Sequence, residues 1–147
     1  MTPKYDPENH IHQQIRKGIE LGDGIPELRT QAEALKAMKN AGFELVYSQD
    51  LADNKDAKPW WSPLTGVWKD TSSIWDAMTT FRTSKVGRYA TQGLLKICET
   101  LSLCPPGTLA VAQTLEIAAV SVLAGGETGI FTPMFLMVGK KPLVPSE

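Results

Sequence analysis

The segment Thr30–Gln49 constrains the fold more than any other stretch, because a helix signal leads directly into a strand signal. Thr30 and Glu33 have the spacing of a capping box, in which two side chains satisfy free N–H groups at a helix start. Apolar residues then recur at helical spacing as far as Gly42, and Phe43–Gln49 alternates as a strand does. A helix that passes into a strand through a glycine turn is typical of α/β proteins, so we expect an α/β fold.

A first helix is predicted upstream of this segment. Isoleucines recur at every fourth position from Ile11 to Ile19, which places them on one stripe. Asp6 or Asn9 can cap the start of this helix, and a glycine-aspartate-glycine turn that finishes at Gly24 ends it.

The second half of the chain carries further helical patterns and a last strand. Helical spacing predicts Ile74–Phe81, Leu94–Leu101 and about 108–124, with the glycine pair 125–126 as the stop of the third. The run Ile130–Val138 is apolar on both faces and predicts a strand. Pro133 lacks an N–H group, so it belongs near the start of that strand or at a bulge.

A polar segment with two adjacent tryptophans, Trp60 and Trp61, separates the two halves. We expect a long loop over about residues 50–63, and structureless loops of this length are often functional. The indoles are costly to leave in water. Spacing alone favours a role in covering the core, and the alternative is that they line a cavity for a large apolar or cationic ligand.

Composition excludes several classes of function. The chain has 147 residues and a net charge of -1, which predicts one domain and gives no basic stripe for nucleic acid. Its two cysteines form no CxxC pair, which argues against zinc and fits a reducing compartment. No secretory signal is present, and the apolar run Ile117–Leu123 is shorter than the ~20 residues of a membrane span. We therefore expect a soluble intracellular protein without a transmembrane segment, and association with a membrane surface stays compatible with the sequence.

The glycine-aspartate-glycine turn around Asp23 does not have the context of a phosphate-binding loop. A dinucleotide fingerprint follows a strand and ends on a third glycine. This turn follows a helix, and Glu27 stands where the third glycine of the fingerprint would be. His10 and His12 point to different faces of a helix, so no metal site is expected.

Several blocks of the sequence, in the same order, resemble the sterol 24-C-methyltransferase family. They are MTPKYDPENHIHQQIRKGIELGDGIPEL (1–28), LADNKDAKPWWSPLTGVW (51–68), FRTSKVGRYAT (81–91) and AGGETGIFTPMFLMVGKKP (124–142). The first block departs from the family at Pro3, where an aspartate is usual, and at His10-Ile11, which replace a proline and a glutamate. The resemblance covers residues 1–142, which we expect to form a C-terminal sterol methyltransferase domain followed by a loose tail, 143–147.

The resemblance implies a class I methyltransferase-like fold, of which this chain would hold a few strands and a helical sterol-facing insert. The family transfers a methyl group from S-adenosylmethionine to C24 of a sterol side chain. Its glycine-rich cofactor loop has no counterpart in this sequence, so the N-terminal cofactor half is expected to be absent. We expect S-adenosylmethionine to serve the complete enzyme and not to bind this chain alone, which would be inactive in isolation.

The resemblance also assigns site residues. It makes Glu20 and Asp23 the catalytic candidates, with Asp6 and Glu8 as substrate-binding candidates. Methylation of an alkene creates a carbocation, which fixed negative charge stabilises, and a base must then remove a proton. A further carboxylate would bind the sterol hydroxyl, and these roles stay unassigned among the four.

Three aromatic residues complete the predicted site. Tyr5, Trp60 and Trp61 are substrate-binding candidates that would line the sterol wall, where aromatic faces stabilise positive charge.

Two alternatives remain open beside the enzyme. The chain can be a non-enzymatic sterol or lipid-binding module, or a partner of a full-length methyltransferase subunit or of its own copies, since a divided sheet exposes a pairing edge. For the enzyme, the resemblance implies the cytoplasmic face of the endoplasmic reticulum or lipid particles.

Overall fold

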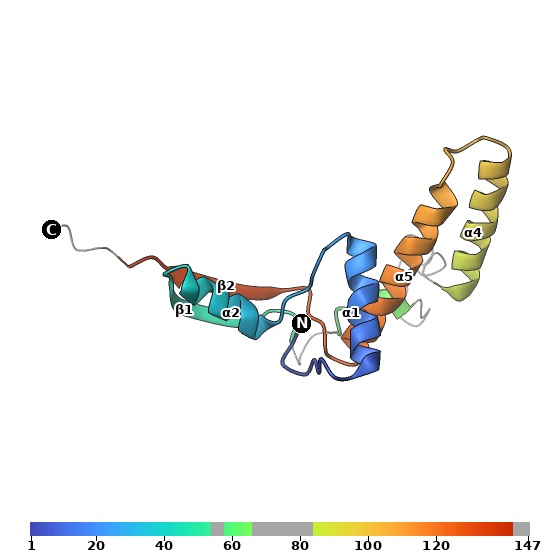
Figure 1. The fold of residues 1–147 in the computed structure, drawn as a ribbon. Helices are drawn as coiled ribbons and strands as arrows, with labels where there is room; N and C mark the ends of the chain where they lie inside the picture. The colour runs from blue at the N-terminus through green and yellow to red at the C-terminus, as the bar shows by residue number, and fades with distance from the viewer. Residues whose placement is uncertain (54–57, 66–83, 143–147) are drawn as a thin grey trace.

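The computed structural model describes residues 1–53, 58–65 and 84–142 and shows a mixed arrangement of helices and a two-stranded sheet. Figure 1 shows an elongated molecule in which the sheet and one helix form one end, a helix crossing forms the middle, and a helical hairpin forms the other end. The elements in chain order are α1 (His10–Asp23), α2 (Gln31–Asn40), β1 (Glu44–Asp50), the 3-10 turn η1 (Ser62–Thr65), α4 (Lys85–Thr100), α5 (Thr108–Glu127) and β2 (Phe135–Lys140).

Helices α1 and α5 approach each other unusually closely because small residues face one another. A Cβ atom added to Gly18 would lie 1.9 Å from the Ser121 hydroxyl oxygen, and one added to Gly22 would lie 1.9 Å from the Ala118 Cβ. Atoms at that separation overlap, so neither position of α1 accommodates a side chain. Gly22, which the sequence suggests is a turn residue, thus serves with Gly18 to bring two backbones together.

The core of the described residues lies under this crossing. Ile15 and Ile19 of α1 are buried against Ile130 and Met1, and Phe131 packs at the edge of the cluster. The segment before α1 is tied in by backbone bonds, since Thr2 N donates to Ile130 O at 2.9 Å and Gln31 N donates to Met1 O at 3.0 Å. The first residues of the chain, the start of α2 and the segment after α5 therefore meet at one place.

The sheet is an antiparallel pair, β1 with β2, in which Glu44 lies opposite Lys140 and Asp50 opposite Phe135. Helix α2 packs beside this pair (Figure 1). Val46 is 64% exposed, and most of β1 is exposed on both faces. The predicted first strand is confirmed to within one residue at each end.

The predicted second strand is wrong in its first half. Strand β2 begins at Phe135, and Ile130 instead belongs to the core. Pro133 has no N–H group to give to a ladder, so regular pairing starts only after it. The prediction that Pro133 lies near the strand start is consistent with this.

The helix ends follow the local signals in two of the predicted cases. Asn9 caps α1 by accepting the Ile11 N–H at 2.9 Å, and Gly24 ends it in the left-handed conformation with φ of 65°. The capping box of α2 is present, with Thr30 and Glu33 satisfying each other's backbone N–H groups.

The predicted stop of α5 at the glycine pair is wrong. The helix continues through Gly125 and Gly126 to Glu127. A Cβ atom on Gly125 would lie 2.8 Å from Phe131, and one on Gly126 would lie 3.0 Å from Trp61. These glycines admit aromatic neighbours and do not end the helix.

Helices α4 and α5 form the projecting hairpin. Helix α4 begins at Lys85, earlier than the predicted Leu94. An ion pair of 2.8 Å joins Arg88 to Glu116, and Glu99 of α4 accepts the Gly107 N–H at 2.6 Å, which caps the start of α5. The predicted helix Ile74–Phe81 and the predicted loose tail, 143–147, lie outside the described residues.

Helix α5 is long and apolar enough to cross a membrane by length and composition. The expectation that no segment meets those two criteria is therefore wrong. That expectation depends on the short uncharged run Ile117–Leu123. The helix is longer, from Thr108 to Glu127, and includes Glu116, which is ion-paired to Arg88. The core helices of soluble proteins meet the same criteria, so the finding is weak evidence for a membrane span.

Candidate functional site

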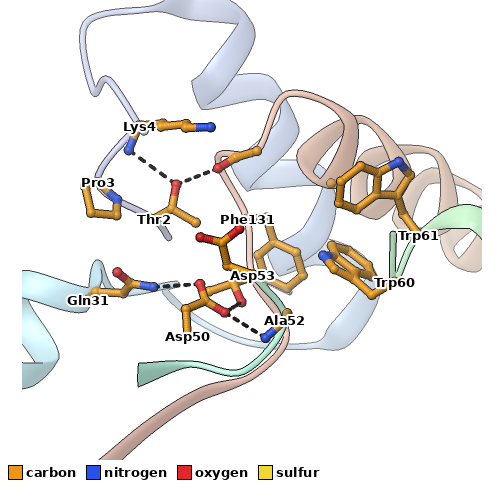
Figure 2. A pocket seen from close by; sticks show the side chains of 13 residues that line it. Thr2, Pro3, Lys4, Gln31, Asp50, Ala52, Asp53, Trp60, Trp61 and Phe131 are labelled. Atoms are coloured by element: carbon orange, nitrogen blue, oxygen red, sulfur yellow. Dashed lines mark hydrogen bonds between the residues drawn. The ribbon is translucent and has the colours of Figure 1, made fainter. Parts of the chain in front are cut away.

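A cavity of about 410 Å³ opens where the helix crossing meets the sheet (Figure 2). This size is within the range of small-molecule sites in proteins. Its lining comes from the first residues of the chain, the start of α2, the end of β1 and the loop after it, the end of α5, and the segment before β2. The lining residues are Thr2, Pro3, Lys4, Gln31, Asp50, Ala52, Asp53, Trp60, Trp61, Gly126, Gly129, Phe131 and Thr132.

One side of the cavity is aromatic. The rings of Trp60 and Trp61 meet edge to face, with centroids 5.5 Å apart and an interplanar angle of 85°. Trp60 meets Phe131 in the same way at 5.9 Å and 70°. Because Gly126 has no side chain, both indoles can lie directly on the last turn of α5. The aromatic side is therefore a packed corner, and both tryptophans line a cavity as well as cover the end of the helix.

The other side of the cavity is polar and is organised by Asp50. Its Oδ1 accepts the Thr132 hydroxyl at 2.6 Å and the Ala52 N–H at 3.0 Å, and its Oδ2 accepts the Gln31 amide at 3.1 Å. These three donors come from three different parts of the chain (Figure 2). The carboxylate is therefore held in one orientation at the rim of the cavity.

The first residues of the chain supply the rest of the polar side. The Thr2 hydroxyl donates to Gly129 O at 2.7 Å and accepts the Lys4 N–H at 3.3 Å. The Lys4 side chain lies along Gly129, where a Cβ atom would be 3.2 Å from Nζ. One cationic and two acidic side chains, Lys4, Asp50 and Asp53, thus line the cavity together with uncharged polar groups.

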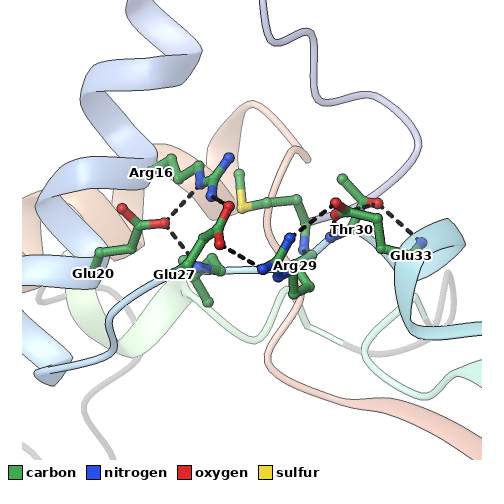
Figure 3. A network of polar contacts seen from close by, with 8 residues as sticks. Arg16, Glu20, Glu27, Arg29, Thr30 and Glu33 are labelled. Carbon is green, nitrogen blue, oxygen red and sulfur yellow. Dashed lines mark hydrogen bonds and ion pairs between the residues drawn. The ribbon is translucent and has the colours of Figure 1, made fainter. Parts of the chain in front are cut away.

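Glu20 lies in a separate polar network, outside the lining of this cavity (Figure 3). Its Oε1 is 2.7 Å from Arg16 Nε and accepts the Leu28 N–H at 2.8 Å. Burial acts to raise the pKa of Glu20, but the Leu28 N–H and the Arg16 guanidinium outweigh it and lower that pKa below its ordinary value of 4.5. A carboxylate with a lowered pKa is a stable anion and a weak proton acceptor.

The ion pairs extend from this point along the surface. Arg16 also contacts Glu27 at 3.1 Å, Glu27 contacts Arg29 at 2.6 Å, and Arg29 contacts Glu33 at 3.4 Å. The chain of charges in Figure 3 thus links α1 to the first turn of α2.

The remaining predicted carboxylates are exposed. Asp23 lies at the last position of α1, in the turn that Gly24 closes. Asp6 accepts the Glu8 N–H at 2.9 Å, which shapes the turn before α1. None of these three lines the cavity of the tryptophans.

Tyr5 also lies outside the cavity lining. It packs on the buried cluster, stacks on His12 at 6.1 Å, and lies 5.9 Å from the Arg16 guanidinium carbon. The structure thus brings Trp60 and Trp61 together but does not bring them to the same cavity as Tyr5 or the predicted carboxylates. The catalytic and substrate-binding roles of these residues stay predictions.

Sequence reasoning missed the polar side of the cavity. Asp50 ends β1 and opens the loop that was singled out as functional, so a carboxylate at that junction was a usable signal. Gln31 and Thr132 are distant in sequence, and only the fold brings them to Asp50.

A second, shallower cavity of about 650 Å³ lies between the end of α2 and the start of β1. Its lining residues are Leu35, Lys36, Lys39, Gly42, Phe43, Glu44 and Leu45. It offers an apolar surface with lysines along it, and no predicted site residue lies there.

Comparisons with known proteins identify a family of similar sequences. Residues 78–143 match the model of the sterol methyltransferase C-terminal family. Over 97% of its length the chain is similar to the sterol 24-C-methyltransferases of Clavispora lusitaniae (47% identity), Kluyveromyces lactis (49%) and Saccharomyces cerevisiae (49%). It spans only 37–38% of the length of these relatives. No solved structure matches the chain. The chain therefore resembles the C-terminal portion of the sterol 24-C-methyltransferases over nearly its whole length.

Proposed function

We propose that this chain supplies the sterol-facing part of an enzyme that moves a methyl group from S-adenosylmethionine to C24 of a sterol side chain. The observation that carries the proposal is the cavity of about 410 Å³, which has an aromatic corner on one side and fixed polar groups on the other. A sterol has the same division, with an apolar ring system and a single hydroxyl. The names of the similar proteins add the substrate class.

The chemistry gives the carboxylates and aromatic rings distinct tasks. Methylation of the side-chain alkene leaves a positive charge on carbon, and removal of a proton then restores a double bond. Fixed anions and aromatic faces lower the barrier to the first step, and a base within hydrogen-bond reach serves the second. The lowered pKa of Glu20 suits it to the role of a fixed anion, and Asp23 stays the second catalytic candidate.

The glycine turn around Asp23 does not fit a cofactor-binding loop. The turn around Asp23 follows helix α1, and Gly24 serves as its C-terminal cap, so the turn is not a glycine-rich loop after a strand. We therefore assign no step of methyl transfer to a cofactor held by this chain. We propose that the chain belongs to the C-terminal part of a class I methyltransferase-like fold and is inactive by itself.

The test is equilibrium binding of a radiolabelled sterol, delivered from cyclodextrin, to the purified chain. We expect saturable binding that falls at least about tenfold in Trp60→Ala and Trp61→Ala, because each indole contributes a large apolar face. The matched control is Tyr89→Ala on α4, an aromatic side chain that is 76% exposed and outside the cavity. Equal binding by all four proteins, or no binding by any, would contradict the proposal.

A second candidate function is assembly with a larger partner. Many large apolar side chains of β1, α4 and α5 are exposed, among them Val46, Leu94, Ile97 and Leu115. Exposed apolar surface on this scale marks interaction sites. A full-length methyltransferase subunit, a second copy of this chain or a membrane surface would each cover it, and for the enzyme we place that membrane at the cytoplasmic face of the endoplasmic reticulum or at lipid particles. Co-sedimentation with vesicles and co-purification with a full-length relative test these partners.

A further inference from the structure

The polar side of the cavity contains a carboxylate whose hydrogen bonding is incomplete. A carboxylate has about four lone-pair sites for donors. Oδ1 of Asp50 receives two donors, from Thr132 and Ala52, and Oδ2 receives one, from Gln31. The described residues therefore leave room for one further donor on Oδ2, and Asp50 faces the cavity (Figure 2).

The orientation of Asp50 is fixed before any ligand arrives. Its three donors belong to the first residue of α2, the loop after β1 and the segment before β2, so the side chain cannot turn without breaking bonds in three places. A preorganised acceptor binds a donor without the cost of immobilising a mobile side chain. Such an acceptor selects a ligand with a donor at one position.

We infer that Asp50 accepts the hydroxyl of the sterol, while the ring system of the sterol lies against Trp60, Trp61 and Phe131. This inference rests on the proposed function and assigns one end of that substrate to one side of the cavity. A hydroxyl is the donor of a sterol, and the edge-to-face rings opposite Asp50 offer the apolar surface that its rings need. Asp50 was outside the set of carboxylates considered for this role from the sequence.

The assignment has a consequence for the aromatic side. The hydroxyl and the alkylated side chain are at opposite ends of a sterol. When Asp50 holds the hydroxyl, the indoles of the same cavity contact the ring system and not the carbon that is methylated. Trp60 and Trp61 are then substrate-binding residues, and charge stabilisation at C24 falls to other groups.

The test compares two ligands that differ only in the donor. Dehydroergosterol, a fluorescent sterol, is bound to the chain and displaced by cholesterol or by its 3-methyl ether, which cannot donate. A hydrogen bond to a charged acceptor predicts that the wild-type chain binds the alcohol at least about tenfold more tightly than the ether. Asp50→Asn removes the charged acceptor at nearly constant shape, and we expect this preference to fall to about twofold or less.

The matched control is Asp53→Asn, which changes the other carboxylate of the cavity. It should keep the wild-type preference for the alcohol. Asp50→Ser, which removes the carboxylate and keeps a small polar side chain, replaces Asp50→Asn when circular dichroism shows that the latter is unfolded. It should lose the preference as well.

The outcomes separate this inference from the function on which it depends. Two outcomes overturn the role of Asp50 and leave the sterol site intact. In the first, sterol binding is saturable but does not distinguish the alcohol from the ether. In the second, Asp50→Asn and Asp50→Ser keep the preference for the alcohol and Asp53→Asn loses it. Failure of every sterol to bind overturns the proposed function itself.

Discussion

The helix crossing and the sheet of this chain are built in opposite ways. At the crossing of α1 and α5, glycines let two backbones meet and Ile19 is fully buried at 0% exposure. In the sheet, β1 is paired to β2 except at a bulge between Leu45 and Tyr47, yet the paired Leu45 is 50% exposed. The comparison shows that hydrogen bonding and burial are separable. The strands of the sheet are hydrogen-bonded but largely exposed, whereas the buried side chains lie at the helix crossing.

The largest expected effect comes from emptying the core at the crossing. Ile19→Ala should lower the free energy of unfolding by about 3 kcal/mol, because it removes a buried side chain and leaves a cavity. Val46→Ala in the sheet should change it by less than about 0.5 kcal/mol. Urea denaturation followed by circular dichroism measures both. Similar losses for the two variants would show that the sheet is as buried as the crossing.

A second pair of variants tests the close approach of the helices. Gly22→Val should destabilise the chain by about 2 kcal/mol, because its Cβ would overlap Ala118. Gly93→Ala in α4 meets nothing within 4 Å and should stabilise by about 0.5 kcal/mol, as alanine favours a helix over glycine. The same urea titration reports both signs, and a neutral Gly22→Val would mean that α1 and α5 stand further apart.

The third prediction concerns the charges that link the two regions. The side chain of Glu20 is 17% exposed and bonded to Arg16 and Leu28, so Glu20→Gln should cost about 1.5 kcal/mol at pH 7. The pKa of Glu20 is lowered in the folded chain, so its contribution is present above the ordinary value of 4.5 and is lost as the pH falls through the folded value. Unfolding at a series of pH values should show the wild-type advantage disappear in acid. An advantage that is independent of pH would exclude this ionic role.

Apart from the control variants, the smallest effect lies at the start of α2, on the side of the sheet. Thr30→Ala removes one half of the capping box and should cost about 1 kcal/mol. Thr108→Ala is a comparable threonine substitution at the start of α5, where Gly107 is the N-cap and makes no side-chain bond. Thr108 donates to Pro105 O and satisfies no free N–H group of the helix start among the described residues, so its loss should cost less. Equal melting temperatures for the wild type and Thr30→Ala would show that the cap does not support the helix.

Local sequence signals predicted where helices and strands lie better than they predicted which residues pack against them. The capping box at Thr30, the Asn9 cap and the strand after Gly42 follow from residues within a few positions of each other, and the structure confirms them. The glycine pair at the end of α5 gave a wrong helix end because glycine occurs both where a helix ends and where a side chain packs closely against a helix. Which of the two applies depends on Phe131 and the tryptophans, and their positions are not local.

The candidate site shows the same division. The tryptophans were singled out from composition, and they do line a cavity. Asp50 was missed because its partners Gln31 and Thr132 come from segments that only the tertiary fold brings together. Glu20 was placed in the site by resemblance, whereas the structure shows it in the Arg16 network.

The central claim is that a sterol lies against the aromatic corner of this chain, and energy transfer tests it most directly. Energy should transfer from the tryptophans of the wild-type chain to bound dehydroergosterol. The transfer at saturation should fall by about half or more when Trp60 and Trp61 are both replaced by phenylalanine, because Förster transfer depends steeply on distance. Phenylalanine keeps an aromatic surface for the ligand, so binding itself is retained. Transfer that is unchanged in the double variant at full occupancy would place the sterol elsewhere and contradict the account.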